Sequence, residues 1–392
     1  MSESALLAAS VAEDEEGPAL TALRRSRKAA ASIGPWRLIA GKLARQRLAM
    51  AAGAIVLLLY LIGAFAEFLA PALPDTARPQ YTFAPPQPIS LYRKGPDGKP
   101  VFGLSVPTYR VSVDSVALRR TFVPDETRPV PIGFFVRGPA YRLWGLIPLE
   151  THLIGPLSPS QPFYLLGADR LGRDVLSRMI FGTRISMSIG LAGVAVSLIL
   201  GIVLGALSGF YGGWVDTLIQ RLIEVVSAMP TIPLWLGLAA AIPLTWSPAS
   251  VYFVITLIVS LLGWTSLARE VRGRFLALRN EDFVTAARLD GASEKRLIFR
   301  HILPSLTSHI LAVVTLAVPT MIVAETSLSF LGIGLKPPVV SWGVLLQDAQ
   351  NIRTVATAPW LLIWPALAVV AAVLAFNFFG DGLRDAADPY GE

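Results

Sequence analysis

The sequence contains no cysteine, which excludes a disulfide framework and any metal site built on thiolates. Its three histidines, His152, His301 and His309, do not cluster at a spacing typical of metal ligands, so no metal site is predicted. Charged residues are also scarce, at 16% of 392 residues, whereas an ordinary soluble domain has about 25%. The shortfall is concentrated in long uncharged runs, and this pattern indicates membrane spans rather than one large soluble core.

Two signatures of enzymes are missing as well. The sequence has no Gly-x-x-x-x-Gly-Lys-Ser/Thr phosphate loop, so the chain cannot form an ATP site of that type. The apolar runs contain no paired carboxylates, histidine site or activated nucleophile, which argues against an enzyme working within the membrane. We therefore predict no catalytic residue and no cofactor bound by this chain.

The uncharged runs predict an all-α membrane protein with six spans, because a bilayer requires about 20 apolar residues per helix. The run Val225–Ala268 is twice that length, and Pro243–Pro248 supplies a turn in its middle, so we divide it into a helical hairpin. In the second span, Gly201, Gly205 and Gly209 recur every fourth residue, which favours close packing of another helix. The six predicted spans are Leu48–Ala66, Ile185–Val215, 225–243, 250–268, Ile302–Ala324 and Thr354–Gly380.

The positive charges orient these spans. Eight Lys and Arg residues lie in residues 1–47 and eight more in the loop Arg269–Arg300, and both stretches fall on one side of a six-span protein. Since Lys and Arg accumulate in cytoplasmic loops, we predict that both termini and this loop are cytoplasmic. The net charge of +7 reflects these membrane flanks, so membrane lipid rather than nucleic acid is the expected contact.

The segment 71–165 differs from the rest of the chain, because it is rich in proline and poor in helix signals. Short stretches at Thr108–Val113 and Gly133–Val136 have patterns typical of strands. Residues 134–147 include an apolar cluster that would be unusual in a disordered tether. We favour a small outer domain that meets a substrate-delivery protein over a poorly ordered insertion.

The loop after the fourth span has the sharpest local pattern. A helix is expected up to Asp290, where Gly291 breaks it, and Ser293 is placed to cap a second helix that continues toward Pro304 and the fifth span. Two short helices meeting at a glycine predict a narrow knob, and such a knob suits either insertion into a cleft of a partner protein or contact with anionic lipid. The basic residues that ring it are Arg288, Lys295, Arg296 and Arg300.

The same loop resembles the signature of ABC importer permeases. Thr285-Ala286-Ala287 is followed after three residues by Gly291 and later by Leu303-Pro304, where that family has Glu-Ala-Ala, three variable positions, Gly and a nearby Leu-Pro. This sequence departs from the pattern with Thr285 in place of Glu, and with His301 where an aliphatic residue is common. The resemblance implies that the loop is a coupling helix that fits a groove of an ATPase subunit. The docking residues that it implies are Thr285, Ala286, Ala287, Arg288, Asp290, Gly291, Ala292, Leu303 and Pro304.

Further motifs resemble one branch, the oligopeptide, dipeptide and nickel importer permeases. The stretch Gly167–Arg178 looks like the motif of this branch before the second span, with Ala168 in place of the usual Thr. Leu328–Gly343 is similar to its outer loop before the last span, and Gly380–Pro389 is similar to its tail. The periplasmic motif residues carried over are Gly167, Asp169, Gly172, Arg173, Asp174, Ser177 and Arg178.

The resemblance implies a type I ABC importer permease fold in a bacterial inner membrane, with a periplasmic insert between spans 1 and 2. It also implies a complex with a second homologous permease subunit, two ATPase subunits that bind ATP and Mg²⁺, and a periplasmic substrate-binding protein. The expected cargo is peptide, with oligosaccharides or nickel as alternatives, and no substrate-binding residue is assigned. An ion-coupled secondary transporter is the less favoured class, because Glu224 and Glu325 lie near span ends, where we expect solvated or helix-terminal carboxylates.

These runs and motifs divide the chain into consecutive parts. The predicted parts are a cytoplasmic segment 1–47, a first span 48–70, a periplasmic insert 71–165, a permease core 166–380 with five spans and the cytoplasmic coupling loop 271–305, and a cytoplasmic tail 381–392.

Overall fold

The computed structural model describes residues 35–94, 100–114, 119–243 and 245–387 of the chain. Five helices in these ranges are each long and apolar enough to cross a membrane. A sixth crossing exists if α7 (Gly213–Ala228) and α8 (Thr231–Ala240), which are bent by 85° at a short break, count as one span. The predicted multi-span helical class is therefore confirmed. The five helices in these ranges that are each long and apolar enough to cross a membrane are α4 (Arg47–Ala64), α6 (Val175–Tyr211), α9 (Pro248–Leu278), α13 (Thr307–Phe330) and α16 (Trp360–Ala387).

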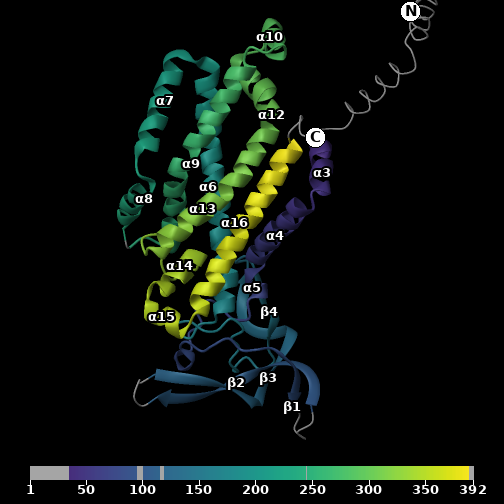
Figure 1. Ribbon diagram of the computed structural model, residues 1–392, viewed down its shortest axis with the longest axis vertical. Coiled ribbons are helices and arrows are strands. Elements are labelled where there is room, and N and C mark those ends of the chain that lie inside the picture. The colour runs from purple at the N-terminus through teal and green to yellow at the C-terminus, as the bar shows by residue number, and fades with distance from the viewer. Residues whose placement is uncertain (1–34, 95–99, 115–118, 244, 388–392) are drawn as a thin grey trace, which may run out of the picture.

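The helices stand side by side as a bundle whose two ends differ (Figure 1). One end carries α3 (Pro35–Arg45), α10 (Asp282–Leu289) and the last turns of α16, whereas a β-sheet lies beyond the other end. At the sheet end, short helices connect α13 to α16. They are α14 (Trp342–Gln347), η3 (Asp348–Gln350) and α15 (Ile352–Thr357). Several residues used in the sequence analysis lie outside the described ranges, namely Arg24, Arg25, Arg27, Lys28, Asp388 and Pro389.

The second span begins earlier than predicted. Its helix, α6, starts at Val175 rather than at Ile185, because two arginines in its first turns are neutralised by carboxylates from elsewhere. Arg178 donates to Asp169, and the Arg184 Nη1 donates to the Glu67 Oε1 at 2.7 Å. The predicted span Ile185–Val215 therefore begins within a longer helix whose first turns carry paired arginines.

The third span starts earlier than the predicted segment 225–243 and is broken within it. The crossing starts at Gly213, directly after α6, and breaks at Met229-Pro230. Proline has no backbone N–H and disfavours a helical residue before it, which explains the break. The charged residue Asp216 is held inside α7 by a bidentate pair, with Arg272 Nε and Nη2 at 2.5 and 2.6 Å from its two carboxylate oxygens.

Close packing of α6 against α9 follows the predicted glycine spacing. A Cβ added at Gly205 would lie 2.5 Å from the Ala268 carbonyl oxygen, and one added at Gly209 would lie 2.6 Å from the Phe275 Cβ. At Gly201 the nearest atoms belong to Leu267, at 2.8 Å. The three glycines therefore let the two helix backbones approach each other, which confirms the prediction.

The insert between α4 and α6 forms a four-stranded antiparallel sheet in an otherwise mostly helical chain. The predicted all-α class did not include this sheet. The long strand β3 pairs through its first half with β2 and through its second half with β4. A small core of Val106, Val130, Ile132 and Phe163 lies beneath the sheet. The strands in spatial order are β1 (Ser90–Lys94), β2 (Pro100–Asp114), β3 (Arg119–Leu143) and β4 (Ile147–Pro156).

The two glutamates near span ends have opposite surroundings. Glu224 is exposed and pairs with Arg221, as a solvated carboxylate should. Glu325 of α13 is fully buried, so the prediction of a solvated carboxylate was wrong there. Its Oε1 accepts hydrogen bonds from the hydroxyls of Ser329 at 2.8 Å and Ser341 at 2.7 Å, and these bonds fasten the segment before α14 to α13. Hydroxyl donors offset the loss of water around a buried carboxylate.

Candidate functional site

The knob, defined here as residues 282–296, projects from the helix bundle at the end opposite the sheet (Figure 1). It consists of α10, a turn at Gly291 and α11 (Glu294–Arg296). The Gly291 N–H donates to the Arg288 carbonyl at 3.1 Å, and the Ala292 N–H donates to the Ala287 carbonyl at 3.0 Å. This pair of bonds closes a helix in a Schellman motif, which requires a left-handed residue at Gly291, where φ is +79°. The predicted helix break is confirmed.

The root of the knob is rigid because it is built into the core of the chain. Val284 of α10 and Leu297 and Ile298 of η2 (Leu297–Ile302) are buried in one cluster with Phe275 of α9. The predicted cap at Ser293 is only positional, since Ser293 stands at the start of α11 without a side-chain hydrogen bond. The chain then passes through α12 (Leu303–Ser305) before the fifth span starts at Thr307, slightly later than predicted.

One side-chain bond ties the knob to the helix bundle. The Tyr211 hydroxyl at the end of α6 donates to the Glu294 Oε2 of α11 at 2.9 Å. Beside it, the Arg279 Nη1 at the end of α9 donates to the Gly209 carbonyl of α6 at 3.2 Å. The knob is therefore bonded to α6, and α6 is bonded in turn to the end of α9.

The predicted docking residues divide into an outer and an inner set. Thr285, Ala286, Arg288, Asp290, Gly291 and Pro304 are exposed. Ala287, Ala292 and Leu303 are half-buried and pack against the root cluster. The inner set shapes the knob, and only the outer set is available to a partner. Sequence reasoning missed Leu289, which is 84% exposed at the tip of α10. A leucine as the last helical residue before a glycine turn was the available signal.

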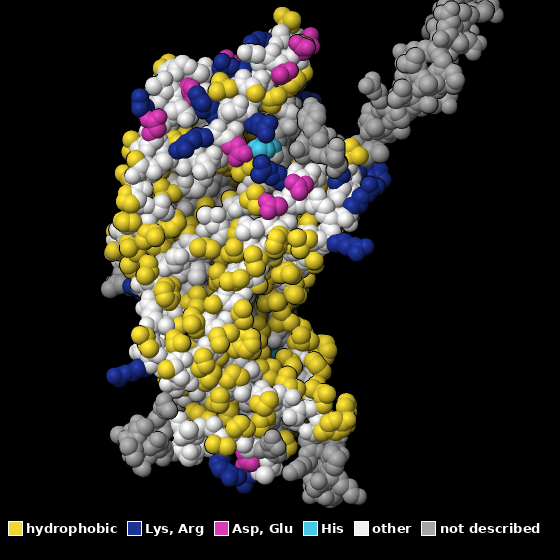
Figure 2. Space-filling model, viewed as in Figure 1, with side chains coloured by type: hydrophobic (Ala, Val, Ile, Leu, Met, Phe, Trp, Pro, Cys, Tyr) yellow, Lys and Arg dark blue, Asp and Glu magenta, His cyan; other side chains and the backbone are white. Residues whose placement is uncertain are grey.

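The surface of the knob is mixed in charge rather than basic. Figure 2 shows acidic, basic and apolar side chains beside one another at this end of the molecule. The four predicted basic residues share the surface with four exposed acidic residues, namely Glu281, Asp282, Asp290 and Glu294. The prediction of a basic knob was therefore wrong, because it counted only one sign of charge. A balanced surface with an exposed leucine suits a protein groove better than an anionic lipid surface.

The second predicted site, the outer motif Gly167–Arg178, lies at the junction of the insert, α6 and α16. All seven of its assigned residues are buried. The Asp169 Oδ2 accepts from the Arg173 Nε at 2.7 Å and also from Arg178, while its Oδ1 accepts from the backbone N–H of Arg173 at 2.9 Å. This closed network of one carboxylate and two guanidiniums positions the chain, and its three side chains are buried.

Glycine and serine in the outer motif complete this junction. Gly172 has a φ of +72°, and a Cβ there would lie 2.0 Å from the Arg78 carbonyl oxygen. The backbone N–H of Ala72, just beyond the first span, donates to the Ser177 Oγ at 3.0 Å. The Trp360 Nε1 at the start of α16 donates to the Ala168 carbonyl at 3.1 Å. The motif thus holds the chain on both sides of the insert and the last span at one point.

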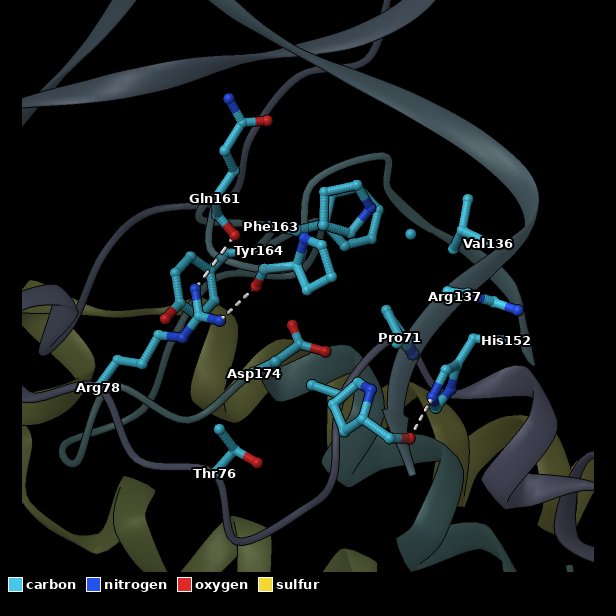
Figure 3. A pocket seen from close by; sticks show the side chains of 16 residues that line it. Pro71, Thr76, Arg78, Val136, Arg137, His152, Gln161, Phe163, Tyr164 and Asp174 are labelled. Carbon is cyan, nitrogen blue, oxygen red and sulfur yellow. Dashed lines mark hydrogen bonds between the residues drawn. The ribbon is translucent and has the colours of Figure 1, made fainter. Parts of the chain in front are cut away.

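Asp174 is the exception within this network. Its Oδ2 caps α6 by accepting from the backbone N–H of Ser177 at 2.8 Å, but its Oδ1 is buried and has no hydrogen-bond partner in the described part of the chain. Figure 3 shows its carboxylate at a cavity of about 60 Å³, which Arg78 and His152 also line. Burial raises the pKa of Asp174 to about 6.

Comparison with known proteins identifies the family of the chain. Residues 201–390 match the binding-protein-dependent transport system inner membrane component, and residues 34–86 match the N-terminal transmembrane domain of oligopeptide transport permease C. The oligopeptide transport system permease protein OppC of Bacillus subtilis is 37% identical over 239 residues, which are 61% of this chain and 76% of that one. The chain belongs to the binding-protein-dependent inner-membrane permease family.

A further curated relative agrees with this family assignment. The glutathione transport system permease protein GsiD of Pectobacterium atrosepticum is 40% identical over 224 residues, which are 57% of this chain and 72% of that one. Among solved structures, an inward-facing form of the MetNI methionine ABC transporter aligns at 15% identity and a TM-score of 0.44, covering 54% of this chain and 97% of that one. The knob lies inside the larger family match, whereas the sheet and the outer motif lie between the two matches.

Proposed function

We propose that this chain forms half of the translocation pathway of an ATP-driven importer, and that its knob docks an ATPase subunit. The observation that carries this proposal is the exposed, glycine-closed tip of α10 on a root buried in the core of the permease. Small side chains at Ala286 and Gly291 make the tip narrow, and Leu289 supplies an apolar anchor. Interfaces derive much of their affinity from a few such anchors seated in pockets.

The orientation of the chain follows from charge and topology. The knob lies at the same end of the bundle as α3, and the basic residues of both stretches assign that end to the cytoplasm. The sheet then faces the periplasm, where a substrate-binding protein would approach. In this orientation both termini are cytoplasmic, and the knob meets the compartment that contains ATP.

The proposed complex contains this chain, a second homologous permease subunit, two ATPase subunits and a periplasmic binding protein. ATP and Mg²⁺ would be bound by the ATPase subunits, since this sequence has no phosphate loop. The proposed cargo is peptide. This assignment is supported by relatives named as oligopeptide, dipeptide and glutathione transport permeases, among them the DppC protein of Alkalihalophilus pseudofirmus at 35% identity.

Two substitutions at the tip test the docking role in the assembled transporter. Ala286→Arg and Leu289→Asp change exposed side chains, so they should leave the fold intact but lower peptide-stimulated ATP hydrolysis and uptake at least tenfold. Gly41→Arg in α3 is the matched control, because a side chain there meets no atom within 4 Å. Full stimulated hydrolysis and uptake in both tip variants would contradict the proposal. Loss of activity in the Gly41→Arg control as well would show a general effect of added charge instead.

A further inference from the structure

The tip of the β3–β4 hairpin exposes large apolar side chains outside the helix bundle. Leu146 at the turn is 77% exposed, and its neighbours on both strands are also exposed. A soluble domain rarely leaves so many large apolar side chains in one patch, and such a patch marks a protein or membrane contact. The exposed residues of the patch are Trp144, Leu146, Ile147 and Leu149, and Phe134 and Phe135 are exposed farther from the turn along β3.

The patch is fastened beside the outer end of the first span. The Trp144 Nε1 donates to the carbonyl of Ala64, the last residue of α4, at 2.7 Å. The rings of Phe65 and Trp144 lie 5.7 Å apart, and the rings of Phe68 and Phe135 lie 6.1 Å apart. Phe68 belongs to α5 (Ala66–Leu69), which continues the line of α4 toward the sheet. The hairpin therefore sits at a fixed position relative to the span.

Two aromatic residues of the hairpin have an unfavourable backbone conformation. Phe135 and Trp144 both have a positive φ, at +55° and +53°, although neither is glycine. A left-handed conformation is unfavourable for a bulky L-residue. Such strain persists only where the surroundings fix it, and it is frequent at functional positions.

The depth of the patch follows from the length of the span. α4 has 18 residues, which gives a length of about 27 Å and nearly spans a hydrocarbon core of about 30 Å. Ala64, and with it the Trp144 indole, therefore lies at the outer membrane–water boundary, where tryptophan is enriched. The exposed apolar face of α4, which includes Leu57, Leu58 and Leu61, leads to Phe65 and the hairpin without a charged residue between them.

We propose that the β3–β4 hairpin is a monotopic membrane element whose tip inserts among the lipid acyl chains of the outer leaflet beside α4. Lipid is the occupant that this geometry selects, because the patch continues the lipid-facing surface of a span at the depth of the interface. A partner protein would have to displace lipid from α4 as well. The inference requires that α4 crosses the membrane, but it does not depend on the docking role of the knob.

Spin labels can test this insertion, because the chain contains no native cysteine. Leu146→Cys places a label at the tip, and Phe102→Cys places one at a site of β2 that is 74% exposed near the far edge of the sheet. Both variants replace exposed side chains and should fold. The labelled transporter, with its partner subunits and without the binding protein, is reconstituted in phospholipid vesicles. Collision with oxygen, which concentrates in acyl chains, is compared with collision with a water-soluble nickel chelate.

The label at 146 should collide with oxygen at least threefold more than with the nickel chelate, and the label at 102 should show the reverse preference. A label at 146 that favours the nickel chelate would place the tip in water and overturn the proposal. A label at 146 that is shielded from both reagents would place it under a protein partner and overturn the proposal equally. Ile147→Cys repeats the test if the Leu146→Cys variant is poorly produced.

Discussion

The knob and the outer motif are the two stretches that most resemble importer permeases, and they differ in almost every physical respect. The knob is exposed, its turn at Gly291 is surrounded by open space, and its buried contacts lie at its root. The outer motif is buried, its turn at Gly172 is enclosed by backbone, and Asp169 bonds to two guanidiniums. A family motif can thus mark a surface for a partner or a fastening inside the chain, and its residue types alone do not tell the two apart.

The largest expected effect comes from removing the central carboxylate of the outer motif. Asp169→Asn leaves Arg178, which is buried, without its counter-charge, and breaking a buried pair in this way costs roughly 3–5 kcal/mol. Thermal unfolding of the purified protein in detergent should show a strongly lowered midpoint. The control is Arg170→Ala, which removes the pair of an exposed guanidinium with the half-buried Asp348 and should cost only about 1 kcal/mol. Equal midpoints for the two variants would mean that the outer motif is not the fastening described here.

Gly172 and Gly291 both have a positive φ, so alanine substitutions at these two positions compare the two turns directly. Gly172→Ala should cost about 2–4 kcal/mol, because it combines an unfavourable φ with a Cβ 2.0 Å from a backbone oxygen that must move. Gly291→Ala has the same φ problem but no atom within 4 Å, so it should cost only about 1 kcal/mol. Urea or thermal unfolding of both variants measures the difference. A larger loss at Gly291 would reverse the assignment of enclosed and open turns.

The smallest effect concerns the second carboxylate of the outer motif. Asp174 has a pKa raised by burial to about 6, above its ordinary 3.8, so its contribution to stability is complete below pH 3.8 and is lost as the pH rises through 6. Asp174→Asn stays uncharged and remains a good cap, so it should be as stable as the parent or up to about 1 kcal/mol more stable at pH 7. The difference should shrink as the pH falls to 5, and unfolding midpoints at both pH values measure it. A destabilised Asp174→Asn protein at pH 7, as expected for Asp169→Asn, would contradict the distinction between the two carboxylates.

The sequence predicted those features of the fold that depend on local pattern. Uncharged length predicted the crossings, the spacing of Gly201, Gly205 and Gly209 predicted the α6–α9 contact, and Gly291 predicted the end of α10. The errors arose where a distant partner changes the meaning of a residue. Pairing by Glu67 lets Arg184 lie within α6.

The same limitation explains what was missed at the two sites. Glu325 is buried because three serine hydroxyls donate to it, and two of them, Ser186 and Ser341, come from distant segments that no local pattern indicates. The motif residues were identified by resemblance, but their burial in one case and exposure in the other depend on tertiary packing. The acidic residues of the knob could have been counted from the sequence, and doing so would have corrected the expectation of a basic surface.

Site-specific crosslinking tests the proposed contact between the knob and an ATPase subunit most directly. Because the chain has no cysteine, Ala286→Cys carries a photo-reactive label at the exposed tip, and Leu222→Cys carries the same label at an exposed position on α7 as control. We predict that illumination of the assembled transporter joins the ATPase subunit to position 286 and not to position 222. An intact, active complex that yields no ATPase adduct from position 286 would contradict the account.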